Sequence, residues 1–451
     1  MAGIADPFFN GYPWVPGCFA SSALSEPNEL NVRAAGRYVN DNLVNGVLAS
    51  TFNCPLISLP MFMTGGNVMV DGRQTAVATQ QMLDENFPGI TEAEFRQYAA
   101  DSLGITNFII VSNPEVHGIQ HIDCYAKFLD EETILVKQVP NWHPEYYCCE
   151  ALAEELANEN NAYGEPYNII RIYCEAYYGN NAAAYTNSLI LNKKVLVPLF
   201  GISHDQQALQ VYQDAMPGYE VIGFQWSGWY HYDALHCRTM GIFDRYMLRI
   251  EHKPLRGEQV FLGVPVIKAR IDDRSEIGLI SDSLRLFWRE TGELLWNVQP
   301  LSYQWNTDSL YAIIPGSSPG KTYEYYIAAS DYSGRSETHP RTAPAGFHTF
   351  IFSGSLSDIF INENANKLIV EPSIFTHETS IRVQTNQAGG SIFIWSTSGM
   401  LMKEINIPAT ANHSVIWDGT DNKGSNMPAG VYIVYYVNNG SSIVEKCMLI
   451  R

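Results

Sequence analysis

Apolar residues in the first half of the chain recur at helical spacing in four segments, and strand-like runs lie between these segments. The helices are predicted to start near residues 27, 91, 144 and 203. The clearest start is Thr91-Glu92-Ala93-Glu94, a capping box ahead of the apolar residues Phe95 and Tyr98. Pro144 opens the third helix, and the fourth should end before Pro217-Gly218. Strands are predicted at residues 133–139, 168–173, 189–191, 195–200 and 220–224.

Helices and strands alternate at a nearly constant interval, which indicates a repeated unit. Each unit contains one helix and two or three strands. This pattern predicts an α/β fold built as a propeller-like ring of about four ββαβ units, rather than a doubly wound parallel sheet. The repeated region should cover residues 1–253.

From about residue 254 the pattern changes to short strands and turns without a convincing helix. Residues 254–352 have the length and turn spacing of a β-sandwich of roughly 100 residues. A joint that contains Ser and Gly then leads into a second all-β domain. This domain covers residues 353–451 with its linker, and its most distinctive runs are Trp417-Asp418-Gly419-Thr420 and Pro428-Ala429-Gly430-Val431-Tyr432.

The composition narrows the classes of partner. A net charge of −19 argues against nucleic acid, because no basic surface is available to neutralise phosphates. The acidic balance suits a cationic substrate, although solubility alone explains it. No apolar run reaches the roughly 18 residues of a membrane helix, and the first residues lack the regions of a signal peptide. The eight cysteines form no Cys-x-x-Cys pair, and vicinal Cys148 and Cys149 should be buried as small apolar side chains.

Four polar residues form the candidate catalytic set, namely Cys237, His121, Asp123 and Asn187. A thiol can attack the flat, cationic carbon of a guanidinium group and form a covalent thiouronium intermediate. His121 would protonate the departing amine and help to activate water. Asp123 would pair with the guanidinium nitrogens, and Asn187 would orient the substrate or Cys237. His121 and Asp123 stand two residues apart, so on an extended segment their side chains would point the same way.

Two rival sites compete with this interpretation. His117, His121 and Asp123 resemble a metal site, but Pro114 and Gly118 predict a loop rather than a helix with two ligands on one face. A papain-like protease would place its cysteine first in the chain, whereas Cys237 comes last. A lone cysteine is also commonly buried and inert. We expect neither a metal nor a cofactor.

Together with the residues named above, roughly the first 250 residues of the chain resemble the guanidino-group-modifying (pentein) superfamily. The resemblance is to bacterial peptidylarginine deiminase of the Porphyromonas type and to its agmatine deiminase relatives. The matching runs are Thr64-Gly65-Gly66-Asn67, His121-Ile122-Asp123-Cys124, Tyr185-Thr186-Asn187-Ser188-Leu189-Ile190-Leu191-Asn192, Ala215-Met216-Pro217-Gly218-Tyr219-Glu220 and Asp233-Ala234-Leu235-His236-Cys237-Arg238-Thr239.

The resemblance implies a metal-free hydrolysis of arginine side chains to citrulline and ammonia. It implies that Cys237 is the nucleophile, His121 the acid/base, Asp123 a guanidinium ligand and Asn187 an active-site polar residue. Residues 254–352 look like the immunoglobulin-like (Ig-like) domain that follows the catalytic domain in the Porphyromonas-type deiminase. Residues 353–451 look like a type IX secretion sorting domain, which implies the secretion machinery as a partner and a secreted or outer-membrane surface location.

Two departures from the family pattern concern substrate binding. The family carries a further aspartate in a Trp-x-Arg-Asp-x-Gly-Pro segment, and this chain begins just after that segment, with Asp6-Pro7. An Arg-Pro-Arg stretch that holds a C-terminal carboxylate is replaced by Gly11-Tyr12-Pro13-Trp14. We therefore expect an N-terminally incomplete chain without its first ring unit.

The leading functional hypothesis is a protein-arginine deiminase that acts on arginine-containing peptides or proteins. One alternative is a catalytically impaired or inactive homologue that acts as a surface-anchored binding module. A second alternative is an agmatine-type deiminase. The appended β domains argue against the last, because a metabolic enzyme of the cytosol needs no sorting domain.

Overall fold

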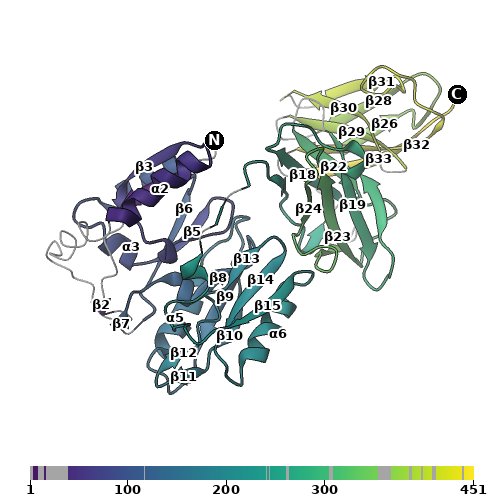
Figure 1. The fold of residues 1–451 in the computed structure, drawn as a ribbon. Helices are drawn as coiled ribbons and strands as arrows, with labels where there is room; N and C mark the ends of the chain where they lie inside the picture. Colours follow the sequence, from purple (N-terminus) through teal and green to yellow (C-terminus); the bar gives the residue numbers. More distant parts are fainter. Residues whose placement is uncertain are drawn as a thin grey trace. The chain divides into compact units, whose positions relative to one another are not determined.

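The structure is a computed structural model with two compact units, Met1–Phe243 and Asp244–Arg451 (Figure 1). The residues described are 4–8, 15–16, 39–115, 117–239, 241–242, 244–260, 264–303, 308–353, 367–384, 389–397, 400–408, 413–438 and 441–451.

Three sheets of the first unit repeat one plan. A short first strand runs antiparallel to the second strand, a helix follows, and a third strand returns parallel to the second. The first sheet contains β4 (Met69–Val70), β5 (Thr75–Thr79), α4 (Glu92–Tyr98) and β6 (Asn107–Val111). The second contains β8 (Ala126–Phe128), β9 (Thr133–Gln138), α5 (Tyr146–Ala157) and β10 (Asn168–Tyr173). The third contains β13 (Leu189–Leu191), β14 (Lys194–Leu199), α6 (Asp205–Ala215) and β15 (Glu220–Gln225).

A further two-stranded sheet has a related but shorter plan. Its strands β1 (Ile4–Phe8) and β3 (Leu56–Phe62) are parallel, and α2 (Val39–Thr51) lies between them in the chain. The described residues therefore contain four strand–helix–strand units, the number that the repeat interval predicts. The helix predicted to start near residue 27 falls mainly on residues 17–38, which lie outside the described residues.

Local sequence signals explain most of these elements. Thr91 caps α4, and the Thr91 and Glu94 side chains each bond to the other's backbone N–H, which confirms the predicted capping box. Strands β9, β10, β13, β14 and β15 lie within one or two residues of their predicted bounds. Helix α6 ends at Ala215, before Pro217, as predicted. Helix α5 begins at Tyr146, so Pro144 lies two residues before the helix, and the prediction that it opens the helix is wrong.

Two apolar clusters hold the first unit together. One joins all three sheets, and its fully buried members include Ile134 and Val136 of β9, Leu156 of α5 and Val197 of β14. The other lies around β3 and β5, where Leu59 and Ala76 are fully buried with Phe95 of α4. Burial of these side chains supplies most of the driving force for folding. The remaining elements of this unit are α3 (Gln81–Asp84), η2 (Ala99–Leu103), and the short strands β2 (Val15–Pro16), β7 (His117–Gly118), β11 (Ala176–Tyr178) and β12 (Asn181–Ala182).

The second unit contains strands and a single 3₁₀ turn, η5 (Ser281–Ser283), among its described residues. Its first sandwich packs a four-stranded sheet on a six-stranded sheet, and Ile267 of β18 and Tyr325 of β23 are fully buried between them. The sheets contain β16 (Leu248–Glu251), β17 (Gly257–Val260), β18 (Val266–Asp273), β19 (Arg285–Glu290), β20 (Asn297–Pro300), β21 (Ser302–Tyr303), β22 (Ser309–Ile313), β23 (Lys321–Ser330), β24 (Ser336–His339) and β25 (His348–Ser353).

The second sandwich packs three strands on five around buried Trp417, Val434 and Ile394. Its strands are β26 (Lys367–Glu371), β27 (Ile374–Phe375), β28 (Thr379–Gln384), β29 (Gly390–Ser396), β30 (Leu401–Ile407), β31 (His413–Trp417), β32 (Gly430–Asn438) and β33 (Ser441–Leu449). The two distinctive runs of this part of the chain fall at the end of β31 and the start of β32. The predicted joint after residue 353 lies outside the described residues.

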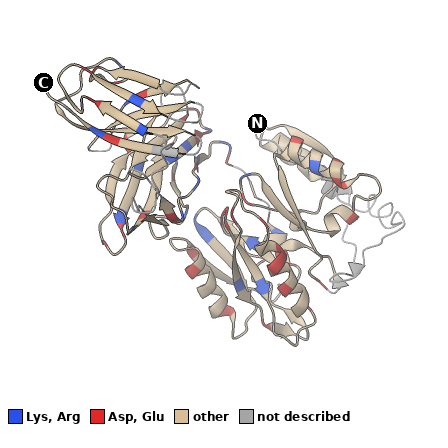
Figure 2. Ribbon diagram, turned by 180° about the vertical axis from the view of Figure 1, so that it is seen from behind, with Lys and Arg blue, Asp and Glu red and all other residues tan. Residues whose placement is uncertain are grey.

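Charged residues are spread over the structure, and Glu and Asp recur on helices α5 and α6 (Figure 2). In the described residues, no helix is long and apolar enough to cross a membrane. Cys148 and Cys149 are both buried, as predicted, but Cys148 is disulfide-bonded, which the sequence did not indicate. Cys149 is free.

Candidate active site

The candidate site forms where short turns precede the strands of different sheets. Asn67 ends turn η1 (Gly65–Asn67), two residues before β4, and Cys124 ends turn η3 (Ile122–Cys124), two residues before β8. Asn187 stands two residues before β13. Cys237 lies in a further turn, η4 (His236–Arg238). The repeat therefore places polar side chains at equivalent positions, and folding of the sheets brings them together.

Asn187 holds the turn that carries Cys237. Its Nδ2 donates to Cys237 Sγ at 3.1 Å, and its Oδ1 accepts from the Cys237 backbone N–H at 3.2 Å. The backbone carbonyl of Asn187 accepts from the N–H of His236 at 3.1 Å. Asn187 is fully buried, whereas Cys237 is exposed. The buried Asn187 amide thus orients a thiol-bearing residue that solvent can reach.

Helix α6 fixes the position of Asn187 in turn. The hydroxyl of Tyr185 donates to Asp205 Oδ1 at 2.8 Å. The hydroxyl of Tyr212 lies 2.9 Å from the Tyr185 carbonyl oxygen and 2.8 Å from Ser188 Oγ. These residues are buried, so each hydrogen bond replaces one that water would otherwise provide. The backbone on both sides of Asn187 is therefore anchored to one helix.

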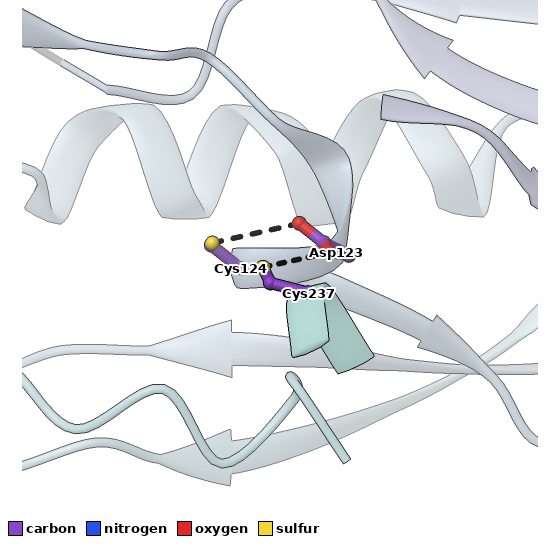
Figure 3. Close-up of side chains that lie close together, drawn as sticks. All are labelled: Asp123, Cys124 and Cys237. Atoms are coloured by element: carbon purple, nitrogen blue, oxygen red, sulfur yellow. Dashed lines mark hydrogen bonds between the residues drawn. The ribbon is translucent and has the colours of Figure 1, made fainter. Parts of the chain in front are cut away.

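Asp123 is the carboxylate at the thiol. The Cys237 thiol donates to Asp123 Oδ2 at 3.2 Å, and His236 Nδ1 donates to the same oxygen at 2.8 Å (Figure 3 shows the thiol contact). Asp123 has no exposed surface. Burial acts to raise the pKa of this carboxyl, but the His236 hydrogen bond and the nearby His121 outweigh it and lower the pKa. Asp123 is therefore ionised at neutral pH.

His121 lies beside Asp123, over Gly66. A methyl group built on Gly66 would stand 2.6 Å from His121 Nδ1 and 3.0 Å from Asp123 Oδ2, so both side chains converge on this glycine. The predicted reason for their convergence is wrong, because Asp123 belongs to the 3₁₀ turn η3 and only His121 is extended. Burial lowers the pKa of His121, which leaves the imidazole neutral near pH 7.

Asn67 of turn η1 links turn η3 to strand β5 through hydrogen bonds. Its Oδ1 accepts from the backbone N–H of Ile122 at 3.2 Å and from that of Thr79 at 3.1 Å. The Thr79 hydroxyl donates to the carbonyl oxygen of Gln120 at 2.7 Å. Gln120, directly before His121, adopts a φ of 59°, an unusual value for a residue with a side chain. The segment that carries His121 and Asp123 is thus fixed by the first sheet.

Cys124 is a second thiol at the site. Its Sγ lies 3.5 Å from Asp123 Oδ1 and 3.9 Å from Asn187 Nδ2, and the residue is fully buried. The hydrogen bond with Cys237, together with burial, raises the pKa of the Cys124 thiol well above its usual range. Cys124 is therefore protonated at neutral pH, and Cys237, which is exposed, is the better candidate nucleophile.

Lys127 supplies a buried positive charge nearby. It lies on β8, three residues after Cys124, and is 7% exposed. Burial lowers the pKa of Lys127 to about 8, although the charges of Asp123 and Cys237 act in the opposite direction. An ammonium group near an ionised Asp123 and a forming thiolate stabilises both anions.

The structure brings all four predicted residues into one region, with direct contacts among Cys237, Asp123 and Asn187. The prediction omitted His236, Cys124 and Lys127. His236 and Cys124 are sequence neighbours of predicted residues, so their chemistry was visible, but only the turn geometry shows that their side chains face the site. The rival ligand His117 belongs to the short strand β7, and its side chain is not among those described.

The region that carries the candidate site matches a known protein family. Residues 29–242 match the family model of Porphyromonas-type peptidyl-arginine deiminase. The matched region contains every residue of the candidate site and ends before the two sandwiches. The match therefore concerns the first unit.

Curated relatives of the matched region are deiminases by name. A proposed agmatine deiminase of Yersinia pestis is 27% identical over 194 residues, which cover 37% of this chain and 53% of the relative. A proposed agmatine deiminase of Legionella pneumophila is 26% identical over 197 residues, which cover 40% and 55%. The chain thus spans about half the length of the curated relatives it matches.

Solved structures named as deiminases also align with part of the chain. The agmatine deiminase of Enterococcus faecalis is 18% identical, with a TM-score of 0.40, over 44% of this chain and 62% of that chain. A structure named as a proposed peptidyl-arginine deiminase is 23% identical, with a TM-score of 0.43, over 53% and 70%. At TM-scores this low the likeness adds nothing on activity.

Proposed function

We propose that this protein is a thiol-dependent protein-arginine deiminase, which converts peptidyl-arginine to peptidyl-citrulline and ammonia. The observation that carries the proposal is the exposed Cys237 thiol, 3.2 Å from the ionised Asp123 and 3.1 Å from the Asn187 amide. The nucleophile of such a reaction must be reachable and oriented, and it needs an anion close by to hold the cationic substrate. The family match of residues 29–242 supports the same reaction.

The first half of the reaction forms a covalent intermediate. The Cys237 thiol gives its proton to neutral His121, and the sulfur bonds to the central guanidinium carbon. The tetrahedral adduct then breaks one carbon–nitrogen bond. His121 passes the proton to the departing nitrogen, which leaves as ammonia, and an S-alkylthiouronium cation remains on Cys237.

The second half of the reaction releases the product. His121 takes a proton from a water molecule, and the oxygen adds to the same carbon. The carbon–sulfur bond breaks, and Cys237 leaves as a thiol after His121 returns the proton. The carbon–oxygen double bond forms as the hydroxyl proton of the adduct passes to solvent, where the released ammonia takes up one proton. Guanidinium and water have then become a ureido group and ammonium. No oxidant, metal or cofactor enters this balance.

Asp123 binds the substrate by exchanging partners. In the structure its Oδ2 accepts from His236 and from Cys237. A guanidinium group presents two parallel N–H donors to a carboxylate, a geometry that a single imidazole cannot match. We infer that an arriving guanidinium displaces His236 Nδ1 from Asp123. His236, which is 27% exposed, has room to turn away.

An agmatine-type deiminase is the second candidate, because the curated relatives carry that name. Agmatine is a free cation that needs no room for a peptide chain. The reaction chemistry would be unchanged, since both substrates present a guanidinium group. A surface-anchored binding module without catalysis is the third candidate, and it predicts guanidinium binding without turnover.

We further propose that the second unit serves secretion and attachment. Residues 254–352 would be an Ig-like domain, and residues 353–451 a type IX sorting domain that makes the protein secreted or places it on the outer-membrane surface. The run Pro428-Ala429-Gly430-Val431-Tyr432 at the start of β32 supports this proposal. Fractionation of cells that express the chain with and without residues 353–451 tests it, and unchanged export of the shortened chain would exclude it.

The first experiment on activity compares three substrates. Citrulline and ammonia are measured with a peptide that has an internal arginine, a peptide that has a C-terminal arginine, and agmatine. Cys237→Ala is the control, and because Cys237 is exposed this variant should fold. Turnover of the peptides that Cys237→Ala abolishes supports the proposal. Turnover of agmatine alone favours the second candidate, and binding without turnover favours the third.

A further inference from the structure

Three ligand atoms of different residues converge at the candidate site. The sulfurs of Cys124 and Cys237 and a carboxylate oxygen of Asp123 all lie within 4.8 Å of one another (Figure 3). Among the described residues, no other group of His, Cys, Asp and Glu of this size has the spacing of metal ligands. The two thiols are 113 residues apart in the chain, so only the tertiary structure assembles this set.

The spacing fits a small tetrahedral cation. Zinc binds thiolate sulfur at about 2.3 Å and carboxylate oxygen at about 2.1 Å, which places neighbouring ligands of a tetrahedron about 3.6–3.8 Å apart. Cys237 Sγ lies 3.2 Å from Asp123 Oδ2, and Cys124 Sγ lies 3.5 Å from Asp123 Oδ1. The two sulfurs lie no more than 4.8 Å apart, so shifts of up to about 1 Å would let one ion touch all three residues.

The surroundings also suit such an ion. Two thiolates and one carboxylate carry three negative charges, and a divalent cation leaves one in excess. The buried ammonium group of Lys127, which interacts with both Asp123 and Cys237, offsets that charge. Asn187 Nδ2 points at both sulfurs, and His236 Nδ1 holds the Asp123 oxygen, so the ligands are oriented by outer partners.

An ion can reach the site from one side. Cys237 is exposed, whereas Cys124 and Asp123 have no exposed surface. A cation from solvent would therefore meet Cys237 first and then bind the two buried ligands. Its fourth position would remain for water.

We propose that Cys124, Asp123 and Cys237 form an inhibitory site for a thiophilic divalent cation such as Zn²⁺. The ion would bind the sulfur that attacks the guanidinium carbon and the carboxylate that binds the guanidinium group. It is an inhibitor and not a cofactor, because the reaction proposed above needs the thiol free. Metal binding does not depend on the proposed function, whereas the inhibition rests on it.

Cobalt binding tests the site directly. The metal-free full chain, kept reduced with a phosphine, is titrated with Co²⁺, and Zn²⁺ is then added in competition with a chelating dye. One equivalent should bind, and the cobalt form should show thiolate-to-metal absorption in the near ultraviolet. Cys237→Ser should remove this absorption, and Cys124→Ser should weaken Zn²⁺ binding at least about tenfold.

Cys174→Ser is the matched control, because Cys174 is a free, fully buried cysteine of the same unit outside the cluster. It should bind cobalt as the parent chain does. Absence of thiolate absorption in the folded parent chain would overturn the proposal. Full cobalt binding by Cys237→Ser would overturn it as well. Neither result depends on how well Cys124→Ser folds. Zinc binding without deiminase activity would uphold this site and count against the proposed function.

Discussion

Replacement of Asn187 by aspartate tests whether the Asn187 amide stabilises the Cys237 thiolate. The change removes one hydrogen-bond donor and leaves the size of the side chain almost the same. Asn187→Asp keeps the volume and the acceptor for the Cys237 N–H, but it replaces the Nδ2 donor, 3.1 Å from Cys237 Sγ, with a carboxylate oxygen. A hydrogen bond to an anion contributes about 1.5–3 kcal/mol, so its loss should slow reactions of the thiolate about 10- to 150-fold. Charge repulsion acts in the same direction.

The assay is alkylation of Cys237 by iodoacetamide at fixed pH, followed on the Cys237 peptide by mass spectrometry. Peptide-level detection is needed because Cys54, Cys124 and Cys149 are also free. Asn168→Asp adds the same charge at an exposed position of β10 and should alkylate at the parent rate. If Asn187→Asp alkylates within about twofold of the parent chain, the Asn187 donor does not stabilise the thiolate and the reasoning fails.

Three further changes probe other parts of the first unit. Gly66→Ala should lower kcat about 100-fold, because its methyl group would displace His121 and Asp123, whereas Gly65→Ala, with open space at its Cβ, should remain active. Thr91→Ala should lower the free energy of unfolding in urea by about 1 kcal/mol, and an unchanged midpoint would contradict the capping role. Burial raises the pKa of Glu115 from 4.5 to about 7. Between these values the native state holds a proton that the unfolded chain releases. The free energy of unfolding should therefore fall as pH rises from about 5 to 7. Glu115→Gln should flatten this decline in unfolding free energy, and an unaltered pH profile would count against it.

Local sequence predicted much of the secondary structure. The capping box at Thr91, the five strands between residues 133 and 225, and the end of α6 before Pro217 all depend on neighbouring residues. Hydrophobic periodicity and capping report such short-range preferences directly. The repeat interval predicted four strand–helix–strand units for the same reason. Closure of these units into a propeller remains a prediction, because it depends on contacts far apart in the chain.

The candidate site was less predictable than the elements around it. Cys237, His121, Asp123 and Asn187 could be named from their chemistry and their local runs. Their convergence was expected from an extended His121–Asp123 segment, but the structure has a 3₁₀ turn there. This turn places Cys124 beside Asp123, and the separate turn η4 brings His236 to the same carboxylate.

The sequence by itself determined the helices and strands between residues 91 and 225 that local signals mark, and it named Cys237 as the candidate nucleophile. Only the tertiary structure decided that Asn187 orients Cys237 and that Asp123 accepts from both His236 and Cys237. Asp123 and Cys237 are 114 residues apart, and no short-range preference relates them. Packing of separate sheets around one core brings them within hydrogen-bonding distance, and that packing depends on the whole first unit at once.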